Sequence, residues 1–542
     1  MDRFSSARLL SDNLVRQQEA TVDTRRNIIA VGFACALALL LTGVAFGVQG
    51  YEYGKAHWEP DGVPVCLAAG LQGAPHVTTD GAQGVIVAWV DCRPSLADCD
   101  IYAQRVGADG SRLWQPDGTP VNSAQDVQFD PRVVSDGDGG ALVAWSDYRN
   151  HTDYSVFAQR RDSAGNRLWA SDGITVAAGI GHQTVVQLVP DGSGGAFVVW
   201  EEWQEYPDTD TNLFARRLDT EGTLLWSMPT TITVAPHEQY KAKAATDGAG
   251  GLLVTWGDLR DPDDSNIYAQ RISTNGAVLW EPNGVLVSPD PTLQRPGLIA
   301  PDGTGGAYVA WYDFRANPNQ ADTYMQRLTA NGMVAWTSDL PAVVDPTYAD
   351  GPDDLIPDGS SGAIVVASRC INGAVEVDVL AQRVNSDGEF LWGSEPVNVT
   401  PWEKQQQFAV AAPDNQGGAY IAWIDKYTDS FAYDVWTQHL GADGTRLWLD
   451  HGVQAVGADG PQDLLAIISD GDGGFIVAWR DRRDGLENPD LYAQRITGDI
   501  GTRYFLPLIQ KNRKSRITVA LRSLRSKLSS CRQWGMSGEV QR

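Results

Sequence analysis

The sequence predicts an all-β chain, and two observations carry this prediction. A unit of 54 to 57 residues recurs along the chain, and a tryptophan closes each copy, at Trp58, Trp114, Trp169, Trp226, Trp280, Trp336, Trp392 and Trp448. A regular period of this length is the signature of a repeat architecture. Glycine (56) and tryptophan (19) are both frequent in the 542 residues, a composition that suits many short strands joined by tight turns.

The copy from residue 130 to residue 169 shows the four strands of one unit. PRVVSD, ALVAWSD, SVFAQRR and RLW are the expected strands, and DGDGG joins the first two. Asp-Gly turns supply the positive φ angles that tight hairpins require. The turn aspartate recurs at Asp80, Asp136, Asp191, Asp247, Asp302, Asp358, Asp414 and Asp470. Asn415 follows Asp414 in place of glycine, and asparagine is the substitute expected where φ is positive.

The second strand of the unit is apolar on both faces, so it must be covered on both sides. Four-stranded antiparallel units packed between like units are the blades of a β-propeller. We therefore expect a single eight-bladed β-propeller over residues 55–506. An open solenoid would need polar capping repeats, and the first and last units look like their neighbours. Tryptophan closes the second strand in seven copies, and Ser368 breaks the series, so we expect its blade to be the loosest.

Trp58 precedes any complete hairpin, which indicates how the ring closes. We expect WEPDGVPV, residues 58–65, to supply the outer strand of the last blade, whose other strands come from residues 467–495. Such closure removes exposed sheet edges. Tyr504 and Phe505 compete for the same place.

The repeat resembles those of exported bacterial β-propeller proteins. DIYAQR at residues 100–105 and DLYAQR at 490–495 are similar to a strand of TolB-like propellers. The GADGSRLW and GADGTRLW turns are similar in placement to the Asp-box of sialidase-like propellers, although they lack its full pattern. The resemblance implies a fold and names no ligand or reaction.

The two ends of the chain differ from the repeats. Residues 27–49 are uncharged and long enough for a transmembrane helix, with Arg25 and Arg26 before them. The positive-inside rule then places residues 1–26 in the cytoplasm and the propeller outside, in a single-pass membrane protein. A cleaved signal, and hence a secreted protein, is the alternative. The tail, residues 507–542, is basic and is read either as a short amphipathic helix or as a disordered segment.

Charge and cysteine usage limit the function classes. The net charge of -26 disfavours nucleic acid as a partner. Cys92 and Cys99 flank a short loop that a disulfide could close in an oxidising compartment. No cysteine or histidine spacing indicates zinc. The recurring W-x-D-x-R motif is read as a brace for the loop base, and the third-strand glutamine as a partner for backbone groups between blades.

The irregular loops between second and third strands form the expected binding face, because loops on a rigid scaffold carry binding groups. The candidate residues are Trp203, Tyr206, Asp208, Asp210, Asp263 and Asp264. Their aromatic and acidic character suits a glycan, a peptide or a cation. Asp208 with Asp210, and Asp261 with Asp263 and Asp264, are the candidate calcium ligands, and no other cofactor is expected.

Catalytic motifs are missing from the sequence: it contains no GxSxG, HExxH or P-loop. We therefore expect a non-catalytic extracytoplasmic scaffold that binds a protein, peptide or glycan. One alternative is a carbohydrate-active propeller enzyme of sialidase-like or glycosidase-like type. Another alternative is a purely structural surface protein.

Overall fold

The computed structural model describes residues 54–497, except for 180, 204–209, 262–263, 346, 372–375, 402–404, 427–432 and 486–487. This part of the chain is all-β and belongs to one compact unit, residues 52–500. Within it, no helix is long and apolar enough to cross a membrane. The predicted anchor or signal (27–49), the basic tail (507–542) and the competing pair Tyr504 and Phe505 lie outside the described residues.

The strands group into antiparallel units that follow the chain, each of four strands except the last, which has five because two short segments pair with β33. Unit 1 is β3(Gln72–Thr79), β4(Val85–Ser95), β5(Asp98–Val106), β6(Thr119–Pro120); unit 2 is β7(Gln128–Ser135), β8(Ala141–Asp147), β9(Ser155–Arg161), β10(Ile174–Ala177); unit 3 is β11(His182–Pro190), β12(Ala196–Trp203), β13(Thr211–Leu218), β14(Thr230–Thr233); unit 4 is β15(Gln239–Thr246), β16(Leu252–Asp261), β17(Asp264–Ile272), β18(Val285–Leu286).

The second half of the chain continues the pattern. Unit 5 is β19(Gln294–Pro301), β20(Ala307–Asn317), β21(Gln320–Leu328), β22(Leu340–Val343); unit 6 is β23(Ala349–Pro357), β24(Ala363–Ile371), β25(Glu376–Val384), β26(Val397–Asn398); unit 7 is β27(Gln405–Pro413), β28(Ala419–Lys426), β29(Tyr433–Leu440), β30(Val453–Val456); unit 8 is β31(Gln462–Ser469), β32(Gly474–Asp481), β33(Asp490–Thr497) with β1(Lys55–Ala56) and β2(Val63–Cys66). Units 6 and 7 share one sheet through a parallel bridge between Val377 and Gln405.

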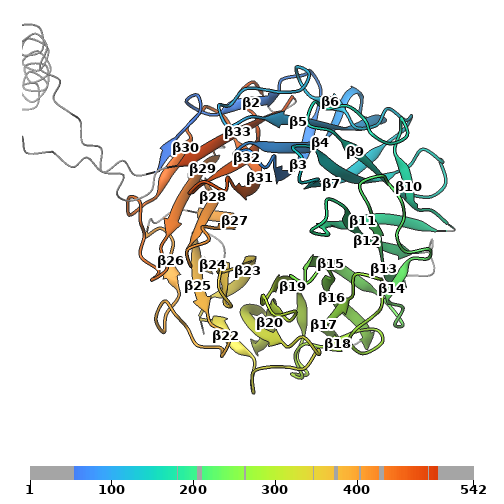
Figure 1. Ribbon diagram of the computed structural model, residues 1–542. Coiled ribbons are helices and arrows are strands. Elements are labelled where there is room, and N and C mark those ends of the chain that lie inside the picture. Colours follow the sequence, from blue (N-terminus) through green and yellow to red (C-terminus); the bar gives the residue numbers. More distant parts are fainter. Residues whose placement is uncertain are drawn as a thin grey trace, which may run out of the picture. The chain divides into compact units, whose positions relative to one another are not determined.

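The succession of units closes on itself. Figure 1 shows the first strand of each unit toward the centre of residues 52–500, with β31 next to β3. The closing strand is the predicted one, because β2 pairs antiparallel with β33, with Val63 opposite Ala493. Trp58 lies at this closure, where its backbone N–H donates to Gln494 and its indole N–H donates to the carbonyl of Ala108 in unit 1.

Each turn aspartate does more than permit a turn. In unit 1, Asp80 accepts the backbone N–H groups of Ala82 and Gly84 and also binds the third-strand Arg105. Arg105 in turn donates to the carbonyl of Ser163 in unit 2. The same arginine recurs as Arg160, Arg217, Arg271, Arg327, Arg383 and Arg495. His439 takes this place in unit 7 and contacts Asp414. Asn415 has φ 59°, as the sequence predicts.

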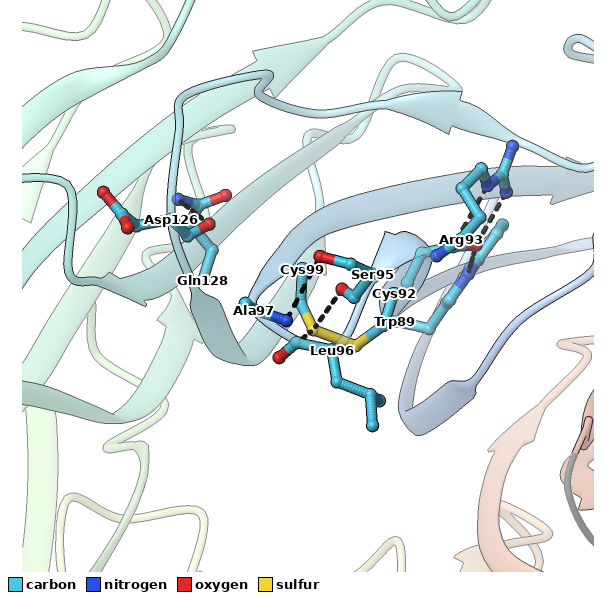
Figure 2. Close-up of a disulfide and its surroundings, with 10 residues drawn as sticks. Trp89, Cys92, Arg93, Ser95, Leu96, Ala97, Cys99, Asp126 and Gln128 are labelled. Carbon is cyan, nitrogen blue, oxygen red and sulfur yellow. Dashed lines mark hydrogen bonds and ion pairs between the residues drawn. A yellow bond between two sulfur atoms is a disulfide. The ribbon is translucent and has the colours of Figure 1, made fainter.

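The Asp–Arg motif braces the end of the second strand, as expected. In unit 1 the guanidinium of Arg93 contacts both carboxylate oxygens of Asp91 and lies 3.9 Å from the ring centroid of Tyr102. The buried indole of Trp89 donates to the same carboxylate, over 2.9 Å. Figure 2 shows this group beside the loop where a disulfide joins Cys92 to Cys99.

The third-strand glutamine serves its own unit, and here the interpretation as a link between blades is wrong. The amide of Gln104 donates to the carbonyl of Gln115, and its oxygen accepts the N–H groups of Arg105 and Trp114. These bonds join the third strand to the turn that follows it. Hydrogen bonds between neighbouring units come from the third-strand arginine and from the closing tryptophan, as with Arg105 and Trp114, which both donate to the carbonyl of Ser163.

The break in the tryptophan series lies one residue earlier than predicted. The strand register puts Ala367 opposite Leu380, where unit 5 puts Trp311 opposite Tyr324. Ala367, Leu380 and Val343 form a small cluster of their own in the core. The prediction of Ser368 is therefore wrong by one residue, since the tryptophan lies nine residues after the turn aspartate in the other units and Ala367 lies nine residues after Asp358.

Candidate functional site

Two positions on the first strands depart from the repeat. The inner position lies four residues before the turn aspartate, and the bulge position lies five residues before it. The inner position holds His76, Arg132, Gln187, Lys243, Leu298, Asp354, Val410 and Ala466. The bulge position holds Pro75, Pro131, Val186, Ala242, Gly297, Asp353, Ala409 and Leu465. Polar residues therefore gather at the inner position of units 1–4 and 6, and the bulge position is charged in unit 6 alone.

His76 is held as a neutral hydrogen-bond donor. Its Nδ1 accepts the backbone N–H of Val133 in unit 2, over 3.3 Å. Burial lowers its pKa to about 3, and the neighbouring positive charges of Arg132 and Lys243 act in the same direction. A neutral imidazole whose Nδ1 accepts must carry its proton on Nε2. His76 therefore offers an N–H group rather than a basic nitrogen to a ligand.

Arg132 and Lys243 supply positive charge on the same inner strands. The Nε of Arg132 donates to the carbonyl of Val186 and its Nη1 to the carbonyl of Pro131, which fixes the guanidinium between units 2 and 3. Burial lowers the pKa of Lys243, and the charge of Arg132 lowers it further. The negative charge of Asp354 opposes this effect. Cations crowded in this way stabilise an anion that binds between them.

Asp354 is fixed by backbone donors. Its carboxylate accepts the N–H of Ala411 in unit 7, over 2.8 Å, and the N–H of Leu355. Burial raises its pKa in spite of these bonds and of the charge of Lys243.

Asp353 differs from Asp354, the other acid of the site, in its close contact with a hydroxyl group. Its Oδ2 lies 2.5 Å from the Oγ of Ser368 on β24. Burial raises the pKa of Asp353 to about 7, the hydrogen bond from Ser368 opposes the rise, and the charge of Asp354 adds to it. Tyr312 of unit 5 is close enough for Asp353 to contribute to raising the phenol pKa, after the larger effect of burial. A half-buried carboxyl that titrates near neutral pH can donate or accept a proton in a reaction.

The predicted loop-face residues lie in separate surroundings. Trp203 ends β12 and contacts the rings of Tyr154 and His182. Asp210 lies 3.9 Å from His237. Asp264 faces Asp261 across the hairpin of unit 4. Tyr206, Asp208 and Asp263 lie outside the described residues. Over the described part of the chain, no three His, Cys, Asp or Glu side chains are grouped as metal ligands would be.

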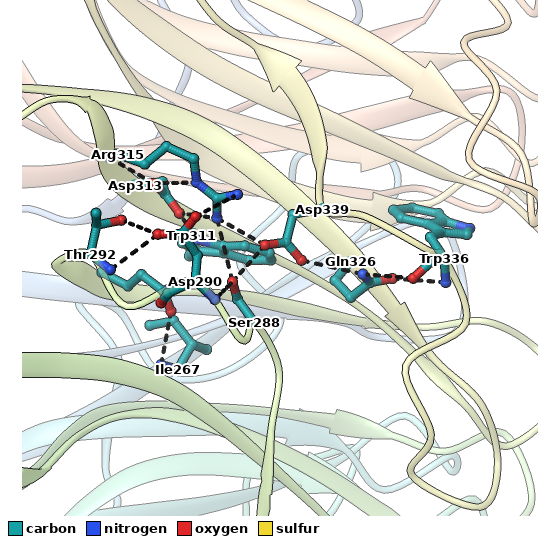
Figure 3. A network of polar contacts seen from close by, with 11 residues as sticks. Ile267, Ser288, Asp290, Thr292, Trp311, Asp313, Arg315, Gln326, Trp336 and Asp339 are labelled. Carbon is teal, nitrogen blue, oxygen red and sulfur yellow. Dashed lines mark hydrogen bonds and ion pairs between the residues drawn. The ribbon is translucent and has the colours of Figure 1, made fainter.

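The hollows on the surface of units 5 and 6 are lined by other residues. One of about 370 Å³ is bordered by Asp290, Arg315 and Trp336. Figure 3 shows that Arg315 already binds Asp313 and Asp339, and that Gln326 joins Asp339 to Trp336. These groups satisfy one another, so this network braces the fold.

Sequence reasoning missed His76, Lys243, Asp353 and Asp354 because they sit inside the repeat rather than in its variable loops. The aligned copies did contain the signal. A charged residue at a position that is otherwise apolar, as with Asp353, can be found by writing the units under one another.

No protein-family model matches the chain, and no curated protein matches it. Several solved structures resemble it weakly. They include a protein of unknown function from Dyadobacter fermentans (12% identical, covering 84% of this chain and 100% of that one, TM-score 0.36). They also include the polysaccharide lyase Uly1 (10%, 84% and 94%, 0.41) and a family PL25 ulvan lyase (12%, 80% and 95%, 0.38).

The expectation of a non-catalytic scaffold without enzymatic activity is contradicted, because these two lyases are enzymes and other neighbours are titled as a glycoside hydrolase and as acylaminoacyl peptidases. With TM-scores below 0.5, they show no more than a distant likeness, so the function of this chain has to be argued from its own residues.

Proposed function

We propose that this chain is a carbohydrate-active enzyme that cleaves an anionic glycan, with Asp353 as its general acid. His76, Arg132 and Lys243 bind the negative groups of the substrate. Asp353 donates its proton to the glycosidic oxygen as the bond from that oxygen to carbon breaks. In hydrolysis, water adds to that carbon and releases its remaining proton to solvent. In elimination, a proton on the neighbouring sugar carbon passes to water and a double bond forms. The assay below distinguishes the two.

The observation that carries the proposal is Asp353 itself. It replaces residues that are proline, glycine or aliphatic in every other unit, and it adjoins Asp354, which interacts with Lys243. Withdrawal of a carboxylate from water costs free energy, and such costly groups with shifted pKa values cluster at functional sites. General acids work best when their pKa lies near the working pH, and the pKa of Asp353, about 7, meets that condition.

Charge supports an anionic substrate. The whole chain carries -26, yet Arg132, Lys243 and the N–H of His76 are brought together on the inner strands. Positive groups concentrated within an otherwise acidic protein favour an anion at that place.

The proposal includes the architecture and the location. We infer an eight-bladed propeller, since the shared sheet of units 6 and 7 divides into two four-stranded units at its single parallel bridge. We also infer that the domain is exported, by an anchor or signal at residues 27–49, because the Cys92–Cys99 disulfide suits an oxidising compartment. The kinship with TolB-like or sialidase-like propellers is part of this proposal too.

The test is an activity screen with the full-length chain on polygalacturonate, alginate and chondroitin sulfate, with dextran as the neutral control. New reducing ends report cleavage, and ultraviolet absorbance of an unsaturated product separates elimination from hydrolysis. We expect turnover of at least one anionic polymer and its loss in Asp353→Asn. Asp387→Asn, an exposed acid of the same unit, is the matched control. Turnover that persists in Asp353→Asn would refute the assigned role.

A further inference from the structure

Five ring side chains gather at the boundary of units 2 and 3: Phe129, Tyr148, Tyr154, His182 and Trp203. Tyr154 is at the centre, with ring centroids 5.1 Å from Phe129, 5.0 Å from Tyr148 and 4.9 Å from His182. The ring centroid of Trp203 lies 5.3 Å from that of His182 and 6.4 Å from that of Tyr154. All five are half-buried.

This cluster, called here the aromatic platform, is not part of the repeat. The positions in unit 1 that correspond to Phe129, Tyr148 and His182 hold Gly73, Cys92 and Leu71. The turn and strand motifs therefore do not require aromatic residues here. Half-buried Tyr, Trp and His present an apolar face together with polar edges, a combination that is typical of binding surfaces.

The platform shares a strand with one of the inner-strand cations. Phe129 and Arg132 both lie on β7, three residues apart, with a β-bulge between them. Arg132 also reaches the carbonyl of Val186 on β11, the strand that begins at His182. A ligand that spans both places would meet ring faces at one end and positive charge at the other.

We propose that the aromatic platform is a stacking subsite that holds a sugar ring of an anionic glycan while its acidic groups reach Arg132 and Lys243. This inference rests on the proposed function and names a subsite of it. A sugar ring combines C–H faces with hydroxyl edges, which suits aromatic faces next to polar groups. The neighbouring positive charge selects an acidic polymer over a neutral one.

The test measures binding separately from turnover. The affinity of full-length Asp353→Asn for polygalacturonate, alginate and chondroitin sulfate is measured by isothermal titration calorimetry, with dextran as the neutral control. Adding Trp203→Ala is expected to weaken binding about tenfold, the loss that corresponds to a strong aromatic contact. Trp203→Phe, which keeps a ring, restores most of the affinity. Tyr433→Ala, at the start of β29 on the far side of the ring, leaves it unchanged.

Four results would overturn the subsite. The first three are unchanged affinity in Trp203→Ala, an equal loss in Tyr433→Ala, and binding of dextran as tight as that of the acidic polymers. A fourth is dissociation of an oligomer by Trp203→Ala in sedimentation, because the platform would then hold a second copy of the chain. In the active protein Trp203→Ala should raise KM and leave kcat unchanged. Failure of all polymers to be cleaved refutes the proposed function alone, since the binding assay needs no turnover.

Discussion

The hydroxyl of Ser368 lies 2.5 Å from a carboxylate oxygen of Asp353, and this contact lowers the proton affinity of the proposed general acid. A hydroxyl that donates to a carboxylate stabilises its ionised form and lowers its pKa. Burial acts in the opposite direction and is the larger effect, so the pKa of Asp353 comes to about 7. The protonation state of Asp353 is therefore sensitive to the hydroxyl of Ser368.

Removal of the hydroxyl should shift the pH dependence of activity. In Ser368→Ala the pKa of Asp353 rises above about 7, because the bond that favours the ionised form is lost. If the protonated form is the acid, kcat/KM of the wild type falls as the pH rises through about 7, and in the variant it falls at higher pH. The measurement is a pH–rate profile on the polymer that is cleaved. If kcat/KM falls at the same pH in the wild type and in Ser368→Ala, the assignment of Asp353 as the general acid is contradicted.

Asp353 should also make the stability of the domain depend on pH. Its pKa is about 7 in the folded state and about 3.9 in an unfolded chain. Between these values the folded state binds more protons, so the free energy of unfolding falls as the pH rises. Asp353→Asn removes this loss and should be more stable than the wild type above pH 7, with the difference smallest below about pH 4.

Urea denaturation at about pH 4 and at a pH above 7 measures the difference in the free energy of unfolding between Asp353→Asn and the wild type. Asp387→Asn, which changes an exposed acid, serves as the control and should follow the wild type. A difference between Asp353→Asn and the wild type that stays constant with pH would show that Asp353 does not titrate in this range.

Ring closure should contribute to the stability of every unit. Trp58 is buried, and its two hydrogen bonds reach Gln494 and Ala108 at opposite ends of the described chain. Trp58→Ala should lower the free energy of unfolding by about 3–5 kcal/mol, as large core truncations do. Leu96→Ala, at a side chain that is 76% exposed, is the control. An unchanged denaturation midpoint in Trp58→Ala would show that the strand does not close the ring.

Unit 6 should open more readily than its neighbours. It has Ala367 and Leu380 where unit 5 packs Trp311 on Tyr324. Less buried apolar surface lowers the free energy of local opening. Hydrogen exchange followed by mass spectrometry should show faster exchange in β24 than in β20 or β28. Equal protection in the three strands would mean that the ion pair of Arg369 with Asp350 compensates for the missing indole.

The sequence was sufficient for the repeating part of the fold because each strand and turn is specified by local residues. The turn aspartates, the positive φ of Asn415 and the closing role of Trp58 all follow from patterns of a few residues. Ala367 was missed although the turn aspartate marks it, since it lies nine residues after Asp358, as Trp311 lies nine residues after Asp302. The approach of Arg132, Lys243 and Asp354 could not be predicted, because it depends on how strands of three different units are placed in space.

The role of Asp353 as general acid is the central claim, and one comparison of rates tests it most directly. The initial rate of cleavage of acidic polysaccharide is measured for the wild type, Asp353→Asn and Asp387→Asn at pH values around 7. We predict that the wild type and Asp387→Asn cleave the polymer and that Asp353→Asn, although folded, loses nearly all turnover. Equal rates in all three proteins, or cleavage of no acidic polymer by the wild type, would contradict the account.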